Sequence, residues 1–230
     1  MMNKHIVIVG ASLGIGLELV KIFAENKGNR VTVLSRNFSS DSPLRQLDNV
    51  TLQAFDLNQE GVRSKAKDIF ALLPQIDILI NNAGFLVNKS FSELTHEDLT
   101  RSYQVNIIGV METIQAALFK MNPEGAHIVN ISSMGGFQGS AKFPGLSAYS
   151  SSKAALASFT ELFAEEFKDS AIKCNCLCLG AVQTEMLSEA FPGYEAPLKA
   201  QEMAAYIHDF SMHANRYMNG KIIPVSLSTP

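Results

Sequence analysis

Residues 5–16 read HIVIVGASLGIG, an apolar run that passes directly into a glycine-rich turn. The run His5–Val9 is short and β-branched, which predicts a strand buried on both faces of a sheet. Gly10, Gly14 and Gly16 then allow positive φ and a close approach of a ligand to the backbone. The following helix offers free N–H groups and the positive end of its dipole to a phosphate. A tight turn that binds nothing is the alternative, because such a glycine pattern is weak alone.

The alternation of apolar strand and amphipathic helix continues along the whole chain. Further strands are expected at residues 30–35, 76–80, 126–132 and 172–179, with weaker candidates at 50–55 and 221–225. Helices are expected over residues 15–26, 94–121 and 149–167. This order predicts right-handed βαβ crossovers and an α/β fold, a doubly wound parallel sheet with helices on both faces. No linker or internal repeat divides the chain, so residues 1–230 are expected to form one domain.

Charge and composition disfavour several classes of protein. Nineteen Lys and Arg oppose 22 Asp and Glu, so the formal net charge is -3 and there is no basic excess for binding nucleic acid. Charged residues make up 18% of the chain, below the typical ~25%, which indicates a large buried core. No stretch reaches the ~18 apolar residues of a membrane span. With three cysteines and no disulfide framework, we expect a cytoplasmic protein without a targeting segment.

The cysteines and histidines do not indicate a metal site. Cys174, Cys176 and Cys178 alternate along an expected strand and therefore share one face of the sheet. A metal site would normally need C-x₂-C spacing or a fourth ligand, so packing in the core is the favoured interpretation. The five histidines form no cluster.

Tyr149 and Lys153 stand four residues apart at the start of an expected helix. This spacing puts them on one face, ~5–6 Å apart at Cβ. A nearby cation stabilises a phenolate, and would lower the pKa of Tyr149 from the ordinary value of ~10 toward a useful acid/base value. An ordinary helix pair without chemistry is the alternative for this motif in isolation. Ser132 and Ser133, at the end of a strand, are by themselves typical turn formers.

In combination, these motifs resemble those of the short-chain dehydrogenase/reductase (SDR) family, from about Lys4 to Val225. The matching segments are Gly10-x-x-x-Gly14-x-Gly16, Asn81-Asn82-Ala83-Gly84, Val105-Asn106-Ile107-Ile108-Gly109, Ile128–Ser133 and Tyr149-x-x-x-Lys153. The resemblance implies a Rossmann-type fold and an NAD(P)-dependent carbonyl reductase or alcohol dehydrogenase acting on a small molecule. It also implies a homodimer or homotetramer, paired through the helices that contain Asn106 and Tyr149.

The resemblance further implies roles for particular residues. Tyr149 would exchange a proton with the carbonyl or alcohol oxygen, and Lys153 would lower its pKa and hold the nicotinamide ribose. Ser133 would donate a hydrogen bond to the reacting oxygen, and Asn106 would fix a water that relays protons. Besides Tyr149 and Lys153, cofactor contacts are implied at Gly10, Ser12, Leu13, Gly14, Ile15, Gly16, Ser35, Arg36, Asp56, Leu57, Asn82, Ala83, Gly84, Gly180, Val182 and Thr184.

The end of the second expected strand bears on the choice of cofactor. An NAD enzyme of this fold places Asp or Glu there to bind the ribose hydroxyls. Here Ser35 and Arg36 occupy the place, and a guanidinium attracts a 2′-phosphate and can bind it with two hydrogen bonds. NADP(H) is therefore preferred and NAD(H) remains possible. A solvated loop cation is the alternative interpretation of Arg36, and Leu13 weakens the NADP case because many NADP-using relatives carry a basic residue there.

Two segments are expected to shape the substrate pocket. Residues 133–149 contain several glycines and read as a flexible loop at the mouth of the site, and residues 186–199 read as a short substrate-binding segment. A dinucleotide-binding sensor or scaffold without turnover is the competing hypothesis, because fold alone does not imply function. Epimerisation or dehydration with a bound cofactor is a third possibility.

Overall fold

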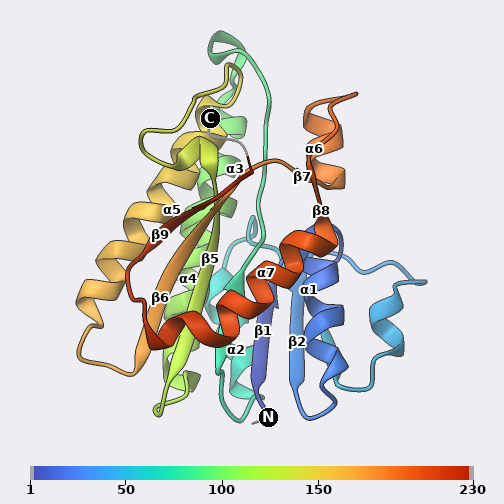
Figure 1. The fold of residues 1–230 in the computed structure, drawn as a ribbon, viewed down its shortest axis with the longest axis vertical. Helices are drawn as coiled ribbons and strands as arrows, with labels where there is room; N and C mark the ends of the chain where they lie inside the picture. Colours follow the sequence, from blue (N-terminus) through green and yellow to red (C-terminus); the bar gives the residue numbers. More distant parts are fainter. Residues whose placement is uncertain (1–2, 228–230) are drawn as a thin grey trace.

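The computed structural model describes residues 3–227, and its centre is a seven-stranded sheet in which every pair is parallel, in the order β3-β2-β1-β4-β5-β6-β9 (Figure 1). The strands are β1 His5–Val9, β2 Arg30–Ser35, β3 Val50–Ala54, β4 Ile78–Asn81, β5 Ala126–Ser133, β6 Ile172–Leu179 and β9 Ile222–Val225. A second ladder pairs β7 Val182–Gln183 with β8 Leu198–Lys199. The predicted doubly wound parallel sheet is confirmed. The order reverses between β1 and β4, which creates the crevice where such sheets bind ligands.

Helices cover both faces of this sheet. The α-helices are α1 Gly14–Glu25, α2 Val62–Ala71, α3 His96–Tyr103, α4 Gly109–Ala117, α5 Ser147–Glu166, α6 Glu185–Ala190 and α7 Ala200–His213. Short helical turns are η1 Pro43–Gln46, η2 Phe91–Glu93, η3 Gln104–Ile108, η4 Leu118–Lys120, η5 Met134–Gly136 and η6 Ala214–Arg216. Figure 1 shows α1 and α7 side by side across one face of the sheet. Helices α2, α4 and α5 pack against the other face.

The alternation within β1 explains why both faces are covered. Ile6 and Ile8 belong to the apolar cluster beneath α1 and α7, whereas Val7 and Val9 belong to the cluster beneath α2, α4 and α5. All four side chains are buried. A strand with apolar residues on both faces must be central in its sheet, and β1 lies between β2 and β4.

The expected long helix over residues 94–121 is interrupted. It forms α3, then the π-helical turn η3, then α4, and it ends in the 3₁₀ turn η4. The π turn lies where Asn106 is fully buried and hydrogen-bonded to other segments. Inserted turns of this kind are frequent at functional sites. The periodicity of apolar residues alone does not reveal one extra residue per turn, so the prediction of a single regular helix was wrong here.

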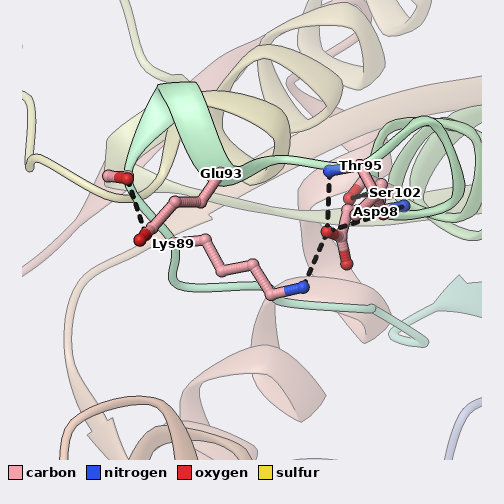
Figure 2. Close-up of polar contacts among 6 residues, drawn as sticks. Lys89, Glu93, Thr95, Asp98 and Ser102 are labelled. Carbon is pink, nitrogen blue, oxygen red and sulfur yellow. Dashed lines mark hydrogen bonds and ion pairs between the residues drawn. The ribbon is translucent and has the colours of Figure 1, made fainter.

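The start of α3 carries a capping box formed by Thr95 and Asp98. Figure 2 shows the Asp98 carboxylate accepting hydrogen bonds from the Thr95 N–H and the Lys89 ammonium, at 3.0 and 2.7 Å. The Thr95 hydroxyl oxygen in turn accepts from the Asp98 N–H. These contacts, led by that from Lys89, lower the pKa of Asp98 to about 2. The box therefore fixes the helix start and anchors the segment that follows β4.

The three cysteines are buried side chains of β6, as expected for core residues. Cys174 accepts a hydrogen bond from the Asn130 amide, and Cys176 and Cys178 pack against Met134 and Ala157. Within residues 3–227, no group of His, Cys, Asp or Glu could hold a metal ion. None of the helices over the same residues is long and apolar enough to cross a membrane.

A buried histidine joins α7 to the sheet. His127 of β5 is 1% exposed, and its Nδ1 lies 3.0 Å from the Ser211 carbonyl oxygen. Its Nε2 lies 3.0 Å from the Asn175 side-chain nitrogen, which also donates to the Met218 carbonyl. Since the amide nitrogen is a donor, Nε2 accepts and the ring is neutral. Burial lowers the pKa of His127 to about 4, and the hydrogen bond to Ser211 opposes this only in part.

This histidine is expected to make the protein less stable in mild acid. The unfolded side chain takes up its proton near pH 6.5 and the folded one near pH 4. The contribution of the neutral, buried His127 ring to the free energy of unfolding is therefore complete above pH 6.5 and is lost as the pH falls toward 4. Between pH 7 and pH 5 we expect the free energy of unfolding to fall by about 2 kcal/mol more in the wild type than in His127→Gln. Urea unfolding at both pH values measures the difference. The exposed His96→Gln is the matched control and should behave as the wild type; equal losses in wild type and His127→Gln would contradict the account.

Candidate active site

A cavity of about 800 Å³ opens at the carboxyl ends of the strands, on both sides of the reversal between β1 and β4. Its wall contains nearly every residue that the sequence assigned to the cofactor: Gly10, Ser12, Leu13, Gly14, Ile15, Ser35, Arg36, Asp56, Leu57, Asn82, Ala83, Gly84, Tyr149, Lys153, Gly180, Val182 and Thr184. Ser133 lines it as well. Gly16 and Asn106 do not line the cavity. Residues far apart in the sequence are thus brought to one site by the carboxyl ends of strands β1 to β6.

The glycine turn is tightly packed against the end of β4. Gly10 has φ +83, and a Cβ built on it would lie 2.4 Å from Ala83 Cα. A Cβ on Gly16 would lie 2.3 Å from the Gly10 carbonyl oxygen, so Gly16 lets α1 approach the turn rather than touching the cavity. The Asn82 amide donates to the Gly10 carbonyl and holds the turn from the other side. These contacts leave no space for a side chain at either glycine.

The start of α1 is arranged to receive an anion. Leu13 is its N-cap and provides no side-chain hydrogen bond, and there is no acidic residue in the first turn. The N–H groups of that turn have no side-chain cap and can serve a ligand in the cavity, with the positive end of the helix dipole. The Glu185 carboxylate of α6 lies close by, with its Oε2 3.4 Å from the place of a Cβ on Gly14. The residues present fit a cofactor pyrophosphate, because the glycines give the approach and the helix gives the donors.

The end of β2 adds a second group of polar atoms. The Ser35 hydroxyl accepts a hydrogen bond of 2.8 Å from the Ala11 N–H, so it supports the glycine turn and keeps its own proton for a ligand. Arg36 is exposed at the cavity wall. No ion pair within residues 3–227 involves its guanidinium. Arg36 is thus a cation that is not neutralised by a carboxylate of the described chain.

Tyr149 lies in the first turn of α5, facing the end of β5. Burial raises its pKa above 10.0, a hydrogen bond with the Ser133 side chain lowers it by less, and Cys178 adds a smaller upward effect. Lys153 is not among the groups that shift the pKa of Tyr149 in this structure, and its ammonium donates to the Ile131 carbonyl oxygen at 2.8 Å. The role of Lys153 in lowering the pKa of Tyr149 stays a prediction.

Lys153 is a buried cation beneath the cavity. Its side chain is 3% exposed, and burial lowers its pKa to about 8, while the thiols of Cys176 and Cys178 oppose the shift. It is therefore still charged at pH 7. A Cβ on Gly84 would lie 3.5 Å from the Lys153 Nζ atom, so the ammonium lies directly below the backbone that follows β4.

Asn106 lies behind the cavity wall and holds that backbone. Its Oδ1 accepts from the Phe85 N–H at 2.8 Å, and its Nδ2 donates to the Phe85 carbonyl at 2.8 Å and to the Ser152 hydroxyl at 2.9 Å. Both amide protons are used by the protein, which leaves one acceptor site on Oδ1 for a water. The π turn η3 is the element that brings this side chain to Phe85 and α5 at once.

Sequence patterns did not identify Arg101 as a site residue. It lines the cavity, its guanidinium lies 4.2 Å from the centre of the Phe85 ring, and its buried Nε has no hydrogen-bond partner. Several apolar side chains of residues 134–146 and 186–194 also line the cavity. The two segments were predicted to shape the substrate pocket, whereas Arg101 belongs to no motif with fixed spacing and only the folded chain shows its place.

Comparison with known proteins agrees with this geometry. The family model described as "short chain dehydrogenase" matches residues 4–195. Carbonyl reductase family member 4 of Xenopus laevis is 30% identical over 191 residues, covering 82% of this chain and 79% of the relative. The 3-oxoacyl-[acyl-carrier-protein] reductase of Rattus norvegicus is 30% identical over 189 residues, covering 80% and 78%. The solved structure of ElxO with NADP bound has a TM-score of 0.84 at 26% identity, covering 98% of each chain.

Proposed function

We propose that this protein, which belongs to the short chain dehydrogenase family, is an NADP(H)-dependent reductase of a small carbonyl compound, or the corresponding alcohol dehydrogenase. The family identifies it as an NAD(P)-dependent oxidoreductase. The observation that supports the finer proposal is one cavity that joins the glycine turn and Arg36 to Ser133, Tyr149 and Lys153. We also propose that residues 1–230 form one domain with residues 186–199 as its substrate-binding segment; residues 1–2 and 228–230 lie outside the described part.

The chemistry divides between the cofactor and the side chains. When bound, the nicotinamide cofactor supplies or accepts the hydride. Tyr149 gives the proton to the carbonyl oxygen in reduction and takes it from the alcohol in oxidation, and Ser133 holds that oxygen by a hydrogen bond. Lys153, a buried cation, stabilises the tyrosinate that remains after the proton has left. This requires the ammonium to leave the Ile131 carbonyl, and both groups lie at the floor of the same cavity.

The test is oxidation of NADPH and NADH against a panel of ketones, aldehydes and quinones. Turnover of free cofactor with a carbonyl compound supports the reductase. Tight cofactor binding without turnover would favour the sensor or scaffold, and conversion of substrate without net cofactor oxidation would favour epimerisation or dehydration.

Arg36 is expected to select NADPH over NADH. A guanidinium that meets a 2′-phosphate makes charge-assisted hydrogen bonds, so Arg36→Ala should raise the Kd for NADPH about 10- to 100-fold and leave that for NADH nearly unchanged. Titration of each cofactor by fluorescence measures both constants. Arg63→Ala, an exposed arginine on α2 away from the cavity, is the control and should change neither. An equal effect of Arg36→Ala on the two cofactors would contradict this role.

We further propose a homodimer or homotetramer paired through α3, α4 and α5. Several large apolar side chains are exposed on these helices and on η3 between α3 and α4, namely Leu99, Ile108, Met111 and Leu162. Leu162 is 67% exposed, and covering such side chains favours association. Light scattering should show an oligomer that Leu162→Glu converts to smaller species, while Leu72→Glu at the end of α2 leaves it intact. A wild-type protein that stays monomeric at high concentration would contradict the assembly.

A further inference from the structure

The cavity extends past Tyr149 into a region with almost no polar side chains. Two segments supply its walls, residues 134–146 after β5 and residues 186–194 that include α6. We call it the apolar lobe, defined by Met134, Phe143, Leu146, Met186, Phe191 and Tyr194. Phe143 is 53% exposed and Tyr194 50%, so their surfaces remain open to a ligand in the cavity. Such a concentration of exposed apolar surface in a concavity is typical of a binding site.

Asn88 holds the two walls of the apolar lobe together. Its Nδ2 donates to the Ala190 carbonyl at the end of α6, at 2.9 Å. Its Oδ1 lies against Gly145, where a Cβ would come within 2.1 Å, and the neighbouring Lys89 N–H donates to the Gly145 carbonyl at 3.0 Å. Lys89 is itself anchored to Asp98 (Figure 2). The apolar lobe is therefore a formed pocket, with its walls joined through the segment that follows β4.

None of the six side chains that define the apolar lobe is a cation. Arg36 follows β2, at the far side of the sheet reversal, and Lys153 donates to a backbone carbonyl at the floor. Arg101 lines the cavity against the Phe85 ring. Lys142 belongs to the wall segment 134–146, but it does not line the cavity, and its ammonium donates to two acceptors of its own loop at 2.6 and 2.8 Å. The apolar lobe itself therefore offers no guanidinium or ammonium to a carboxylate or phosphate of a substrate.

A carboxylate lines the cavity beside the apolar lobe. Glu189 of α6 is a lining residue and lies next to Ala190, whose carbonyl accepts from Asn88. Glu185 of the same helix lies instead at the glycine turn, with its Oε2 3.4 Å from the place of a Cβ on Gly14. Glu189 is exposed, so solvent screens its charge in part. A substrate anion in the apolar lobe would still meet the like charge of Glu189.

We propose that the apolar lobe binds an uncharged carbonyl compound with an aromatic or bulky aliphatic group beside the carbonyl. This inference rests on the proposed function and adds the substrate class. It disfavours ketoacids and phosphorylated sugars, which would bring an anion into the apolar lobe. Phe143, Phe191 and Tyr194 are the specificity-determining residues, and Glu189 is the group that rejects anions.

A matched pair of substrates tests the charge of the preferred compound. Methyl benzoylformate and benzoylformate share the same ketone and phenyl ring and differ in ester against carboxylate. With saturating NADPH, the ester should have a kcat/KM about 10²-fold or more above that of the carboxylate, because the buried carboxylate has no partner. An equal or higher value for the carboxylate would overturn the proposal.

Two variants separate the apolar and the charge contributions. Phe191→Ala should lower kcat/KM for the ester about tenfold by removing apolar contact area, whereas Phe91→Ala, on an exposed turn outside the cavity, should not. Glu189→Gln should raise kcat/KM for benzoylformate several-fold and leave the ester nearly unchanged. If Glu189→Gln changes both substrates equally, the assignment of Glu189 is wrong.

Calorimetric binding distinguishes failure of this inference from failure of the proposed function. Each compound is titrated into NADPH-saturated protein, using the wild type if it shows no turnover and Tyr149→Phe if it does. Preferential binding of the ester without turnover would retain the substrate class and reject the reductase. Equal binding of the two compounds, or binding of neither, would overturn the substrate class.

Discussion

Tyr149→Phe is expected to lower kcat for carbonyl reduction by about 10³-fold, within the range for loss of a general acid. The hydroxyl lost is the group that interacts with Ser133 at the cavity wall. The phenyl ring keeps the packing of the tyrosine, so the Kd for NADPH should change by no more than about threefold, because the cofactor loses at most one neutral hydrogen bond. Initial rates of NADPH oxidation and a fluorescence titration of NADPH measure the two effects.

Tyr217→Phe is the matched control for this result. Tyr217 is 82% exposed and does not line the cavity. Removal of its hydroxyl should leave kcat within a few-fold of the wild type. If Tyr149→Phe retains wild-type turnover, Tyr149 is not the acid, and another group must protonate the substrate oxygen.

Gly10→Ala is expected to produce the second large effect, on both folding and cofactor binding. The added methyl group would lie 2.4 Å from Ala83 Cα and 2.5 Å from Ala83 N, and both are backbone atoms of the segment directly after β4. The methyl also imposes a cost of about 1–2 kcal/mol for an L-residue at positive φ, and the overlap adds about 1–3 kcal/mol. We expect a loss of about 2–5 kcal/mol in the free energy of unfolding and at least a tenfold weaker NADPH affinity.

Gly139→Ala separates backbone strain from the overlap. Gly139 has φ +84, against +83 at Gly10, but no heavy atom would lie within 4 Å of its Cβ. This variant should therefore lose only the ~1–2 kcal/mol of left-handed strain and keep its NADPH affinity. Urea unfolding and cofactor titration of the two variants, side by side, give the comparison. Equal behaviour of Gly10→Ala and Gly139→Ala would show that close packing at the turn is not what the cofactor requires.

The sequence was sufficient for the sheet and for most of the cavity wall, for a physical reason. A strand such as His5–Val9 carries apolar side chains on both faces, and these are buried only when helices cover both faces of the sheet. A parallel sheet also brings the carboxyl ends of its strands to one edge. Residues that end strands, such as Ser35, Asn82 and Ser133, were therefore predictable neighbours. The bounds of the predicted strands differ only slightly from those in the structure. The strand predicted over residues 76–80 is β4, Ile78–Asn81, because Ile76 forms an isolated bridge with Met121 outside the sheet.

Features that depend on the third dimension were not predictable. The π turn η3 and the burial of Asn106 behind Phe85 follow from contacts with α5, not from local propensity. The raised pKa of Tyr149 follows from burial in a site that four-residue spacing does not reveal. The unpartnered Nε of Arg101 and the link made by Asn88 likewise involve residues with no motif around them.

The most direct test of hydride transfer is to follow deuterium from the cofactor to the product. Wild-type protein is incubated with a ketone substrate and NADPH carrying deuterium at both positions of nicotinamide C4, and the alcohol is analysed by mass spectrometry. The account predicts one deuterium on the carbinol carbon of the alcohol, in amounts equal to the NADPH oxidised, and none with Tyr149→Phe over the same time. Tightly bound NADPH that yields no deuterated alcohol from any carbonyl compound in the panel would contradict it and favour a dinucleotide-binding protein without turnover.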